Sequence, residues 1–306
     1  MAHGIARPDH LIDSLARTLN LSLYDFSLVS DRFHYFKGIA SFLKKRGVEV
    51  YHSSVSFAAD VDTRARDLKK EVLRVLEKSG KEKVHIIAHS MGGLDARHMI
   101  VNEQMSEYVA TLTTIGTPHR GTPVARSALE IGMDGVIKRF RKILNLEGIR
   151  SVTPANCRNF NRRARQEEAT NSVEYRVYYS SKRCENVFLP FQLTYKIVEK
   201  QEGINDGLVS LKSQKWTRYL KSDSGKIKPI IQRQFPIPAD HLDQIGWWNL
   251  NEIHKAGWWN MKALRAKNQH EMIIKRVYLE IAREVTGLAT PIRKRQRVRS
   301  RAKKTA

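Results

Sequence analysis

The sequence predicts an α/β fold with a mostly parallel sheet and helices on both faces. Short apolar runs alternate along the chain with amphipathic helical patterns, which is typical of a parallel sheet covered by helices. One apolar run, residues 84–88, leads within two residues to a serine flanked by small residues, and a helical pattern follows at once. The length of 306 residues fits one large domain of this class or two small ones.

Helices and strands alternate in the N-terminal half. Residues 62–79 carry apolar side chains on one helical face and charges on the other, and Gly80 follows, so we expect an amphipathic helix that ends there. Residues 84–88 form a short apolar run typical of a buried strand. The same patterns predict helices over residues 36–46 and 94–104, and strands over residues 48–51 and 108–115.

The C-terminal half contains fewer clear strands. Alternating patterns predict strands over residues 173–180 and 227–235, and an apolar stripe predicts a closing helix over residues 270–285. Between residues 121 and 170 no convincing strand is found, and the stretch from Asp134 to Glu147 is typical of a helix with one apolar and one basic side. We expect this insertion to be a helical lid above the serine; the alternative is a surface helix packed on the body.

The net charge of the chain and the lengths of its apolar runs limit the binding partners and the cellular location that we expect. The formal net charge is +23, and such an excess favours an anionic membrane surface or nucleic acid as a partner. Residues 291–306 are strongly basic, without any acid, and we expect a disordered, solvated tail. No nucleic-acid-binding motif is recognisable, which argues against nucleic acid. Because no secretory signal or membrane-spanning run is found, we expect an intracellular, cytoplasmic protein, or a mitochondrial one if the natural N-terminus is longer.

Ser90 is the candidate nucleophile. It follows the buried strand and precedes a helix, and the residues two positions to either side, Ala88 and Gly92, are small. This pattern predicts a nucleophile elbow, in which a sharp turn exposes the serine hydroxyl. An ordinary strand-to-helix turn is the alternative. In an elbow, main-chain N–H groups at the helix N-terminus can bind a developing oxyanion.

A serine nucleophile needs a base, and the base needs an orienting acid. After such an elbow the acid comes first in the chain and the histidine second. Asp206 lies between turn residues after the strand predicted over residues 173–180, and His241 follows the strand predicted over residues 227–235. Asp240 and Asp243 remain alternatives for the acid. The other histidines considered lie too close to the serine or do not follow a strand: His85, His89, His254 and His270.

Four blocks in this order resemble a known family. They are Ala-His-Ser-Met-Gly-Gly-Leu-Asp-Ala-Arg at 88–97, Gly-Thr-Pro-His-Arg-Gly at 116–121, Asn-Asp-Gly-Leu-Val at 205–209 and Asp-His-Leu-Asp at 240–243. With the segment 35–39, they are similar to the bacterial triacylglycerol lipases and their intracellular relatives. The resemblance implies an α/β-hydrolase fold over residues 1–290, with a lid at about 121–170 and the basic tail 291–306 outside it.

The resemblance also implies roles for individual residues. Ser90 is the nucleophile, Asp206 the acid and His241 the base. The oxyanion is bound by the main-chain N–H groups of Ile5, which follows His3-Gly4, and of Met91. The family has a buried strand before the His-Gly pair, and only two residues precede it here, so we expect a truncated first core strand.

Secreted members of the family bind a structural calcium near the catalytic histidine. Asp243 matches one ligand position, but the next ligand position falls on Trp247 and no upstream acidic partner is evident. Calcium prefers six to eight oxygen ligands. We therefore expect no metal, with Asp243 as the single calcium candidate, and the chemistry needs no cofactor.

The sequence predicts a serine hydrolase that cleaves carboxylic esters, with triacylglycerol as the first substrate class. An esterase, phospholipase or acyltransferase of the same fold would share every residue of the triad. A catalytically impaired membrane- or nucleic-acid-binding protein is the alternative from another class. We expect a lipid ester substrate and peripheral contact with an anionic membrane through the stretch from Asp134 to Glu147 and the tail.

Overall fold

The main sheet has four parallel strands. The computed structural model describes residues 1–3, 35–56, 59–130, 146–247 and 261–288. In these residues β1 (Val84–His89), β2 (Val109–Ile115), β3 (Glu174–Tyr179) and β6 (Ile231–Gln234) pair in the order β1-β2-β3-β6. All three pairings are parallel, so the carboxyl ends of the strands lie at one edge.

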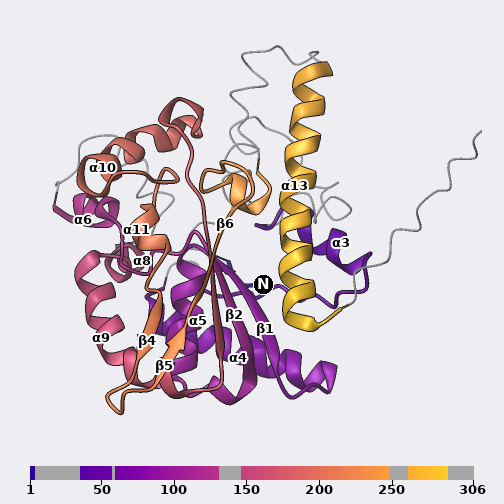
Figure 1. Cartoon of the computed structure of the whole chain (residues 1–306), viewed down its shortest axis with the longest axis vertical. Coiled ribbons are helices and arrows are strands. Elements are labelled where there is room, and N and C mark those ends of the chain that lie inside the picture. The colour runs from indigo at the N-terminus through magenta and orange to yellow at the C-terminus, as the bar shows by residue number, and fades with distance from the viewer. Residues whose placement is uncertain (4–34, 57–58, 131–145, 248–260, 289–306) are drawn as a thin grey trace, which may run out of the picture.

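Helices cover both faces of this sheet (Figure 1). On one face α4 (Val61–Ser79) and α5 (Met91–Asn102) pack in a core that contains Ile86 of β1. On the other face α3 (Ile39–Lys44) and α13 (Met261–Thr286) share a core with Ile87, the next residue of β1. Successive strand residues point to opposite faces, so these two cores lie on opposite sides. The predicted α/β fold with helices on both faces is confirmed.

Local chemistry sets the ends of the long helix α4. The Asp60 carboxylate accepts hydrogen bonds from the main-chain N–H groups of Asp62 and Thr63, which caps the first turn. Gly80 follows the last turn with a φ of 66°, a left-handed conformation that glycine adopts without strain. Both signals are present in the sequence, and the helix predicted over residues 62–79 is confirmed.

The region expected to form a lid is helical where it is described. It contains α6 (Pro123–Glu130), α8 (Leu146–Ser151) and α9 (Pro154–Thr170). The Ser151 hydroxyl oxygen accepts a hydrogen bond of 3.3 Å from the main-chain N–H of Val61, which ties α8 to the body. Most of the predicted helix from Asp134 to Glu147 lies outside the described residues, as does the tail 291–306, and the lid remains a prediction.

Two strand predictions need correction. The strand predicted over residues 227–235 is two elements, because β5 (Ile227–Pro229) pairs antiparallel with β4 (Tyr219–Lys221) and only β6 joins the main sheet. Pro229 has no N–H to continue a ladder, and the chain changes sheets there. No strand is assigned over residues 48–51 either. Met1 lies beside the end of this segment, where its amino group donates a hydrogen bond of 2.6 Å to the carbonyl of Tyr51.

Residues 1–3 lie beside β1, at the place expected for the strand before the His-Gly pair. Ala2 forms a parallel bridge with Ala88. Its N–H donates to the carbonyl of Ile87 at 2.9 Å, and its carbonyl accepts from the N–H of His89 at 3.1 Å. His3 is thereby held next to the residue that precedes Ser90.

The segments that follow β3 and β6 build the edge where the site lies. They are η3 (Cys184–Asn186), η4 (Leu189–Phe191), α10 (Gln192–Glu202), α11 (Leu211–Gln214) and η5 (Asp243–Ile245). A further short helix, η2 (Ser106–Tyr108), lies elsewhere in the chain and precedes β2. Among the described helices, none has the length and apolar character needed to cross a lipid bilayer.

Candidate active site

Ser90 lies in the sharp turn between β1 and α5. Its φ of 56° and ψ of −134° are unusual for a residue with a side chain. The turn brings Gly92 against the chain start, where an added Cβ would lie 2.6 Å from the carbonyl oxygen of His3. Thr117 fixes the turn from the side, because its hydroxyl donates to the Ser90 carbonyl at 2.9 Å. The sequence pattern therefore forms the strained elbow that it predicts.

The fold brings Ser90, Asp206 and His241 together in one hydrogen-bonded chain. His241 Nδ1 lies 2.8 Å from Asp206 Oδ2, and His241 Nε2 lies 2.8 Å from Ser90 Oγ. An ionised carboxylate only accepts hydrogen bonds, so Nδ1 carries the proton and Nε2 has the free lone pair. That lone pair accepts the hydrogen bond of the serine hydroxyl, as general-base activation requires.

Asp206 is held in place by its own turn. The side chain is fully buried, and Oδ1 accepts hydrogen bonds from the N–H groups of Leu208 at 3.0 Å and Val209 at 2.8 Å. The Asp206 carbonyl accepts from the N–H of His241 at 2.9 Å, which ties the two loops together. These donors stabilise the carboxylate charge and leave Oδ2 to face the imidazole.

The alternative acids point elsewhere. Asp240 accepts main-chain hydrogen bonds from Phe188, Leu242 and Asp243. Asp243 Oδ2 lies 2.8 Å from the ammonium of Lys182. Burial and the neighbouring Asp243 charge raise the pKa of Asp240 to about 7. Both carboxylates hold the loop that carries His241, and neither is hydrogen-bonded to its imidazole.

Residues 65–159 match the family model described as a PGAP1-like alpha/beta domain. Triacylglycerol lipase 2 of Saccharomyces cerevisiae is 31% identical over 222 residues, which cover 70% of this chain and 63% of that protein. A triacylglycerol lipase of Pseudarthrobacter phenanthrenivorans is 42% identical over 94 residues, or 30% of this chain and 29% of that protein. Over 70% of its length, this chain is similar to a triacylglycerol lipase. The matched part thus spans less than two thirds of each relative.

Solved structures have the same fold as this chain. The metagenomic carboxyl esterase MGS0156 superposes with a TM-score of 0.57 at 15% identity, covering 82% of this chain and 70% of that chain. The mature lipase BlEst2 of Bacillus licheniformis superposes with a TM-score of 0.52 at 17% identity, covering 71% of this chain and 81% of that chain. At these identities the similarity concerns the fold, which is that of an α/β hydrolase.

The predicted oxyanion donors are described only in part. Met91 is buried and is the first residue of α5, where a main-chain N–H has no partner within the helix. It directly follows Ser90, which is the position the elbow requires. Ile5 lies outside the described residues, so its role remains a prediction.

The residues around Asp243 do not fit the calcium site that the resemblance to secreted triacylglycerol lipases implies. Its Oδ2 is engaged by the Lys182 ammonium, and Oδ1 lies 3.4 Å from His270 Nε2. No group of three or more acidic, histidine or cysteine side chains with metal-binding geometry is found in the described part of the chain. The positive charge beside Asp243 is therefore supplied by a lysine.

A second set of residues at the site was missed by sequence reasoning. Gln244 Nε2 donates to Asp206 Oδ2 at 3.0 Å, and its Oε1 lies 3.1 Å from His89 Nε2. His89 Nδ1 lies 2.7 Å from the hydroxyl of Tyr35. In the sequence, His89 lies directly before Ser90, too close for its ring to reach the Ser90 hydroxyl. Its contact with the acid through Gln244 depends on residues far apart in the chain.

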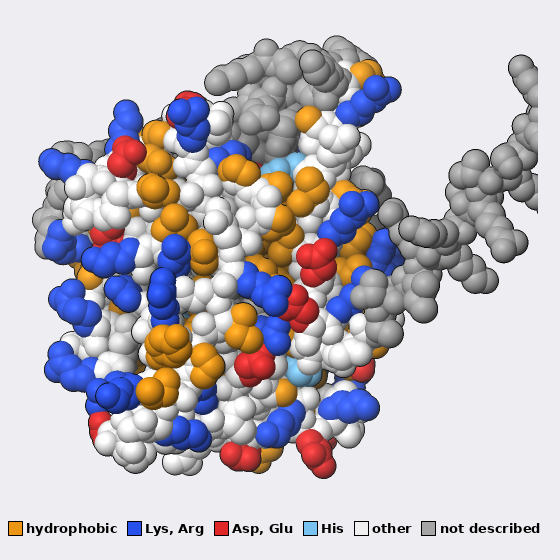
Figure 2. Space-filling view, viewed as in Figure 1, with side chains coloured by type: hydrophobic (Ala, Val, Ile, Leu, Met, Phe, Trp, Pro, Cys, Tyr) orange, Lys and Arg blue, Asp and Glu red, His pale blue; other side chains and the backbone are white. Residues whose placement is uncertain are grey.

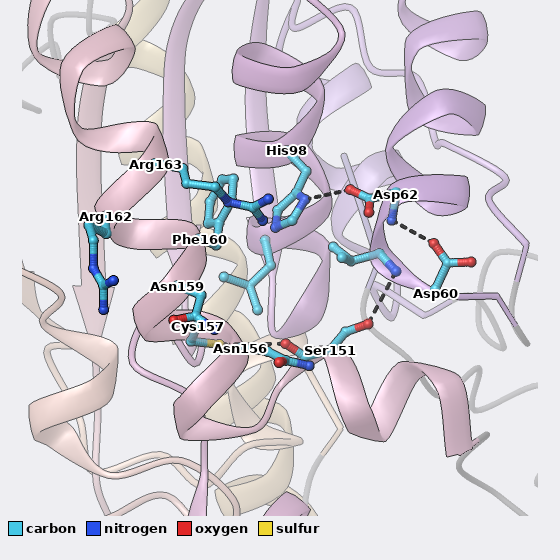
Figure 3. Close-up of a pocket in the computed structure, with 12 residues that line it drawn as sticks. Asp60, Asp62, His98, Ser151, Asn156, Cys157, Asn159, Phe160, Arg162 and Arg163 are labelled. Carbon is cyan, nitrogen blue, oxygen red and sulfur yellow. Dashed lines mark hydrogen bonds and ion pairs between the residues drawn. The ribbon is translucent and has the colours of Figure 1, made fainter.

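A cavity of about 530 Å³ lies apart from the triad, among α4, α5, α8 and α9 (Figure 3). His98 stacks on Phe160 with 3.6 Å between ring centroids and lies 2.9 Å from an oxygen of Asp62. Burial lowers the pKa of His98 to about 4, so the ring is neutral at pH 7. Neither Ser90 nor His241 lines this cavity.

Proposed function

We propose that this chain is a serine hydrolase that cleaves the carboxylic esters of lipids. The supporting observation is the hydrogen-bonded chain from Ser90 through His241 to Asp206, with 2.8 Å at both contacts of the imidazole. Serine, a neutral histidine base and a buried acid on a strained elbow together form an acyl-transfer site.

The reaction follows from the positions of the protons. Ser90 Oγ attacks the ester carbonyl while His241 Nε2 takes the hydroxyl proton, and Asp206 stabilises the imidazolium. The oxyanion is bound by the N–H of Met91 and by that of Ile5. His241 then gives its proton to the leaving alcohol as the C–O bond breaks. Water, activated by the same histidine, attacks the acyl-enzyme and releases the acid with Ser90 restored.

Triacylglycerol is the first substrate class to test, because relatives similar in sequence to this chain are named triacylglycerol lipases. The same triad would serve an esterase, a phospholipase or an acyltransferase. The structurally similar carboxyl esterase and a Legionella pneumophila phospholipase with a TM-score of 0.53 show that one fold accommodates several substrates.

Hydrolysis of p-nitrophenyl esters of short and long acyl chain, with emulsified triacylglycerol alongside, tests the proposal. We expect turnover that favours long chains and that falls by about 10⁴–10⁶ in Ser90→Ala. A Ser90→Ala protein that kept most of the activity would refute the assignment of the nucleophile. A folded wild-type protein without turnover on any of these esters would refute the proposed function.

We further propose that the chain works at an anionic lipid surface. Apolar side chains are exposed around α6, η4 and α10, with exposed fractions of 38% for Leu129, 60% for Leu189 and 50% for Leu193. Figure 2 shows Lys and Arg distributed among apolar side chains over the visible face, rather than concentrated in one stripe as in many nucleic-acid-binding proteins. The stretch from Asp134 to Glu147 and the tail 291–306 would add basic contacts.

Vesicle sedimentation tests this surface. We expect binding to phosphatidylglycerol-containing vesicles that weakens with salt and weakens further in Leu189→Ser/Leu193→Ser. Equal binding to neutral and anionic vesicles would contradict the electrostatic part. Retention on DNA that is lost on deletion of residues 291–306 would support the nucleic-acid alternative.

A further inference from the structure

The hydrogen-bonded chain continues beyond Asp206. The same oxygen, Oδ2, that accepts the hydrogen bond of His241 at 2.8 Å also accepts one from Gln244 Nε2 at 3.0 Å. Gln244 lies in η5 and is fully buried. The acid is thus shared between a catalytic imidazole and an amide that cannot titrate.

The donor and the acceptor can be assigned for each hydrogen bond that links Asp206 to Tyr35. The carboxylate requires a donor from Gln244, so its amide turns the NH₂ to Asp206 and the carbonyl oxygen to His89. That oxygen accepts the Nε2–H of His89 at 3.1 Å, which leaves Nδ1 to accept the hydroxyl proton of Tyr35 at 2.7 Å. Burial lowers the pKa of His89, so the ring is neutral, as this pattern requires.

The Gln244 side chain is closely packed against the main chain of Gly116. Gly116 follows β2 with a φ of 56°, and a Cβ there would lie 2.1 Å from Gln244 Oε1 and 3.4 Å from Asp206 Oδ2. The hydroxyl of Tyr278 donates to the main-chain carbonyl of Gln244 at 3.0 Å, so α13 holds η5 from the other side. Gly116, which has no side chain and directly follows β2, and Tyr278 on α13 thus position Gln244 together.

We propose that Gln244, oriented by His89 and Tyr35, is a positioning residue that sets the orientation and effective charge of Asp206. The proposal rests on the proposed function of the triad. A second N–H on Oδ2 spreads the negative charge that the His241 imidazolium meets. Loss of this N–H would therefore strengthen the attraction between Asp206 and the protonated imidazole.

The first test compares Gln244→Met with Gln232→Met. Methionine keeps the volume and removes the amide, and Gln232 donates only to the main-chain carbonyls of Lys215 and Thr217, so it controls for loss of a structural amide. We expect Gln244→Met to lower kcat/KM about tenfold, mainly through kcat, and to move the acid limb of the pH profile upward by about half a unit. A profile that coincides with those of the wild type and Gln232→Met would overturn the proposal.

The second test uses tyrosine hydroxyls and guards against a misfolded glutamine variant. Tyr35→Phe keeps the ring and removes the donor to His89, and Tyr175→Phe is its control because that hydroxyl is bound by Asn171 on another part of the fold. We expect about a twofold to fivefold loss for Tyr35→Phe, with the acid limb moving the same way. In the Gln244→Met background, Tyr35→Phe should cause no further loss of activity, because both variants interrupt the same series of hydrogen bonds. Additive losses would contradict the proposal.

A substrate-free measurement separates this proposal from the function on which it rests. The ring resonances of His241 are followed by NMR against pH in the full chain, in wild type and in both variants. A midpoint that rises in Gln244→Met and Tyr35→Phe supports the positioning role even if no ester is hydrolysed, in which case only the proposed function fails. Hydrolysis that depends on Ser90, together with an unchanged midpoint, would reject the positioning role alone.

Discussion

Asp206 and Asp243 are both fully buried carboxylates close to His241 in the fold, but they bind different partners. Asp206 faces the neutral imidazole at 2.8 Å and accepts main-chain and amide N–H groups. Asp243 faces the Lys182 ammonium at 2.8 Å and belongs to a cluster with Asp240. Residue type and burial are therefore the same, and the partner alone distinguishes the carboxylate of the proposed triad from the carboxylate of the scaffold.

Replacing each of the two aspartates with asparagine should show the difference between them most clearly. Asp206→Asn cannot stabilise the imidazolium and favours the wrong tautomer of His241, so we expect kcat to fall by about 10⁴. Asp243→Asn leaves the triad contacts in place and should lower stability far more than kcat per folded molecule. Steady-state kinetics and thermal unfolding on both variants measure this; similar kcat losses would show that Asp243 also acts on the histidine.

Removing the cation of the scaffold cluster should give the next largest effect. Lys182→Met leaves Asp240 and Asp243 buried without their counter-charge, and we expect a loss of about 3–5 kcal/mol in unfolding free energy. The control is Lys70→Met, since the Lys70 side chain is 78% exposed and pairs only at the surface, and its effect should stay within about 0.5 kcal/mol. Urea titration compares the two, and equal midpoints would mean that Lys182 is dispensable.

The pH dependence of stability should reveal the raised pKa of Asp240 in the scaffold cluster. The pKa of Asp240 is raised in the folded chain to about 7 by burial and the Asp243 charge, above the ordinary aspartate value of 3.8. The folded state therefore keeps a proton that the unfolded state loses, and this contribution to stability is complete below about pH 4 and lost as pH rises to about 7. Wild type should lose Tm over this range relative to Asp240→Asn, which cannot titrate. Parallel Tm curves would contradict the raised pKa.

The smallest expected effect concerns the outer partner of Asp243. His270 Nε2 lies 3.4 Å from Oδ1, and its side chain is 15% exposed. Because Lys182 already supplies the charge, His270→Gln should cost about 1 kcal/mol or less and leave kcat unchanged. Thermal unfolding and ester hydrolysis check both parts. A loss as large as that of Lys182→Met would mean that the imidazole carries much of the balancing charge.

The elements of the fold could be read from the sequence where a signal is local. Apolar periodicity with Asp60 and Gly80 at its ends defines α4, and the apolar run before Ser90 defines β1. The strand predicted over residues 48–51 and the undivided strand over residues 227–235 were wrong, because strand pairing depends on which backbone lies alongside. Periodicity carries no information about that neighbour.

The sequence by itself singled out Ser90 as the candidate nucleophile, because the elbow depends on small residues within two positions of Ser90 and on the strand and helix that flank it. It also determined the order of acid and base, which placed Asp206 and His241 among few candidates. Only the tertiary structure decided which carboxylate meets the imidazole, since Asp206, Asp240 and Asp243 are all buried and differ in side-chain direction. The roles of Lys182 and Gln244 were hidden for the same reason. Each acts through partners from distant parts of the chain, and long-range contacts of this kind leave no periodic or spaced signal.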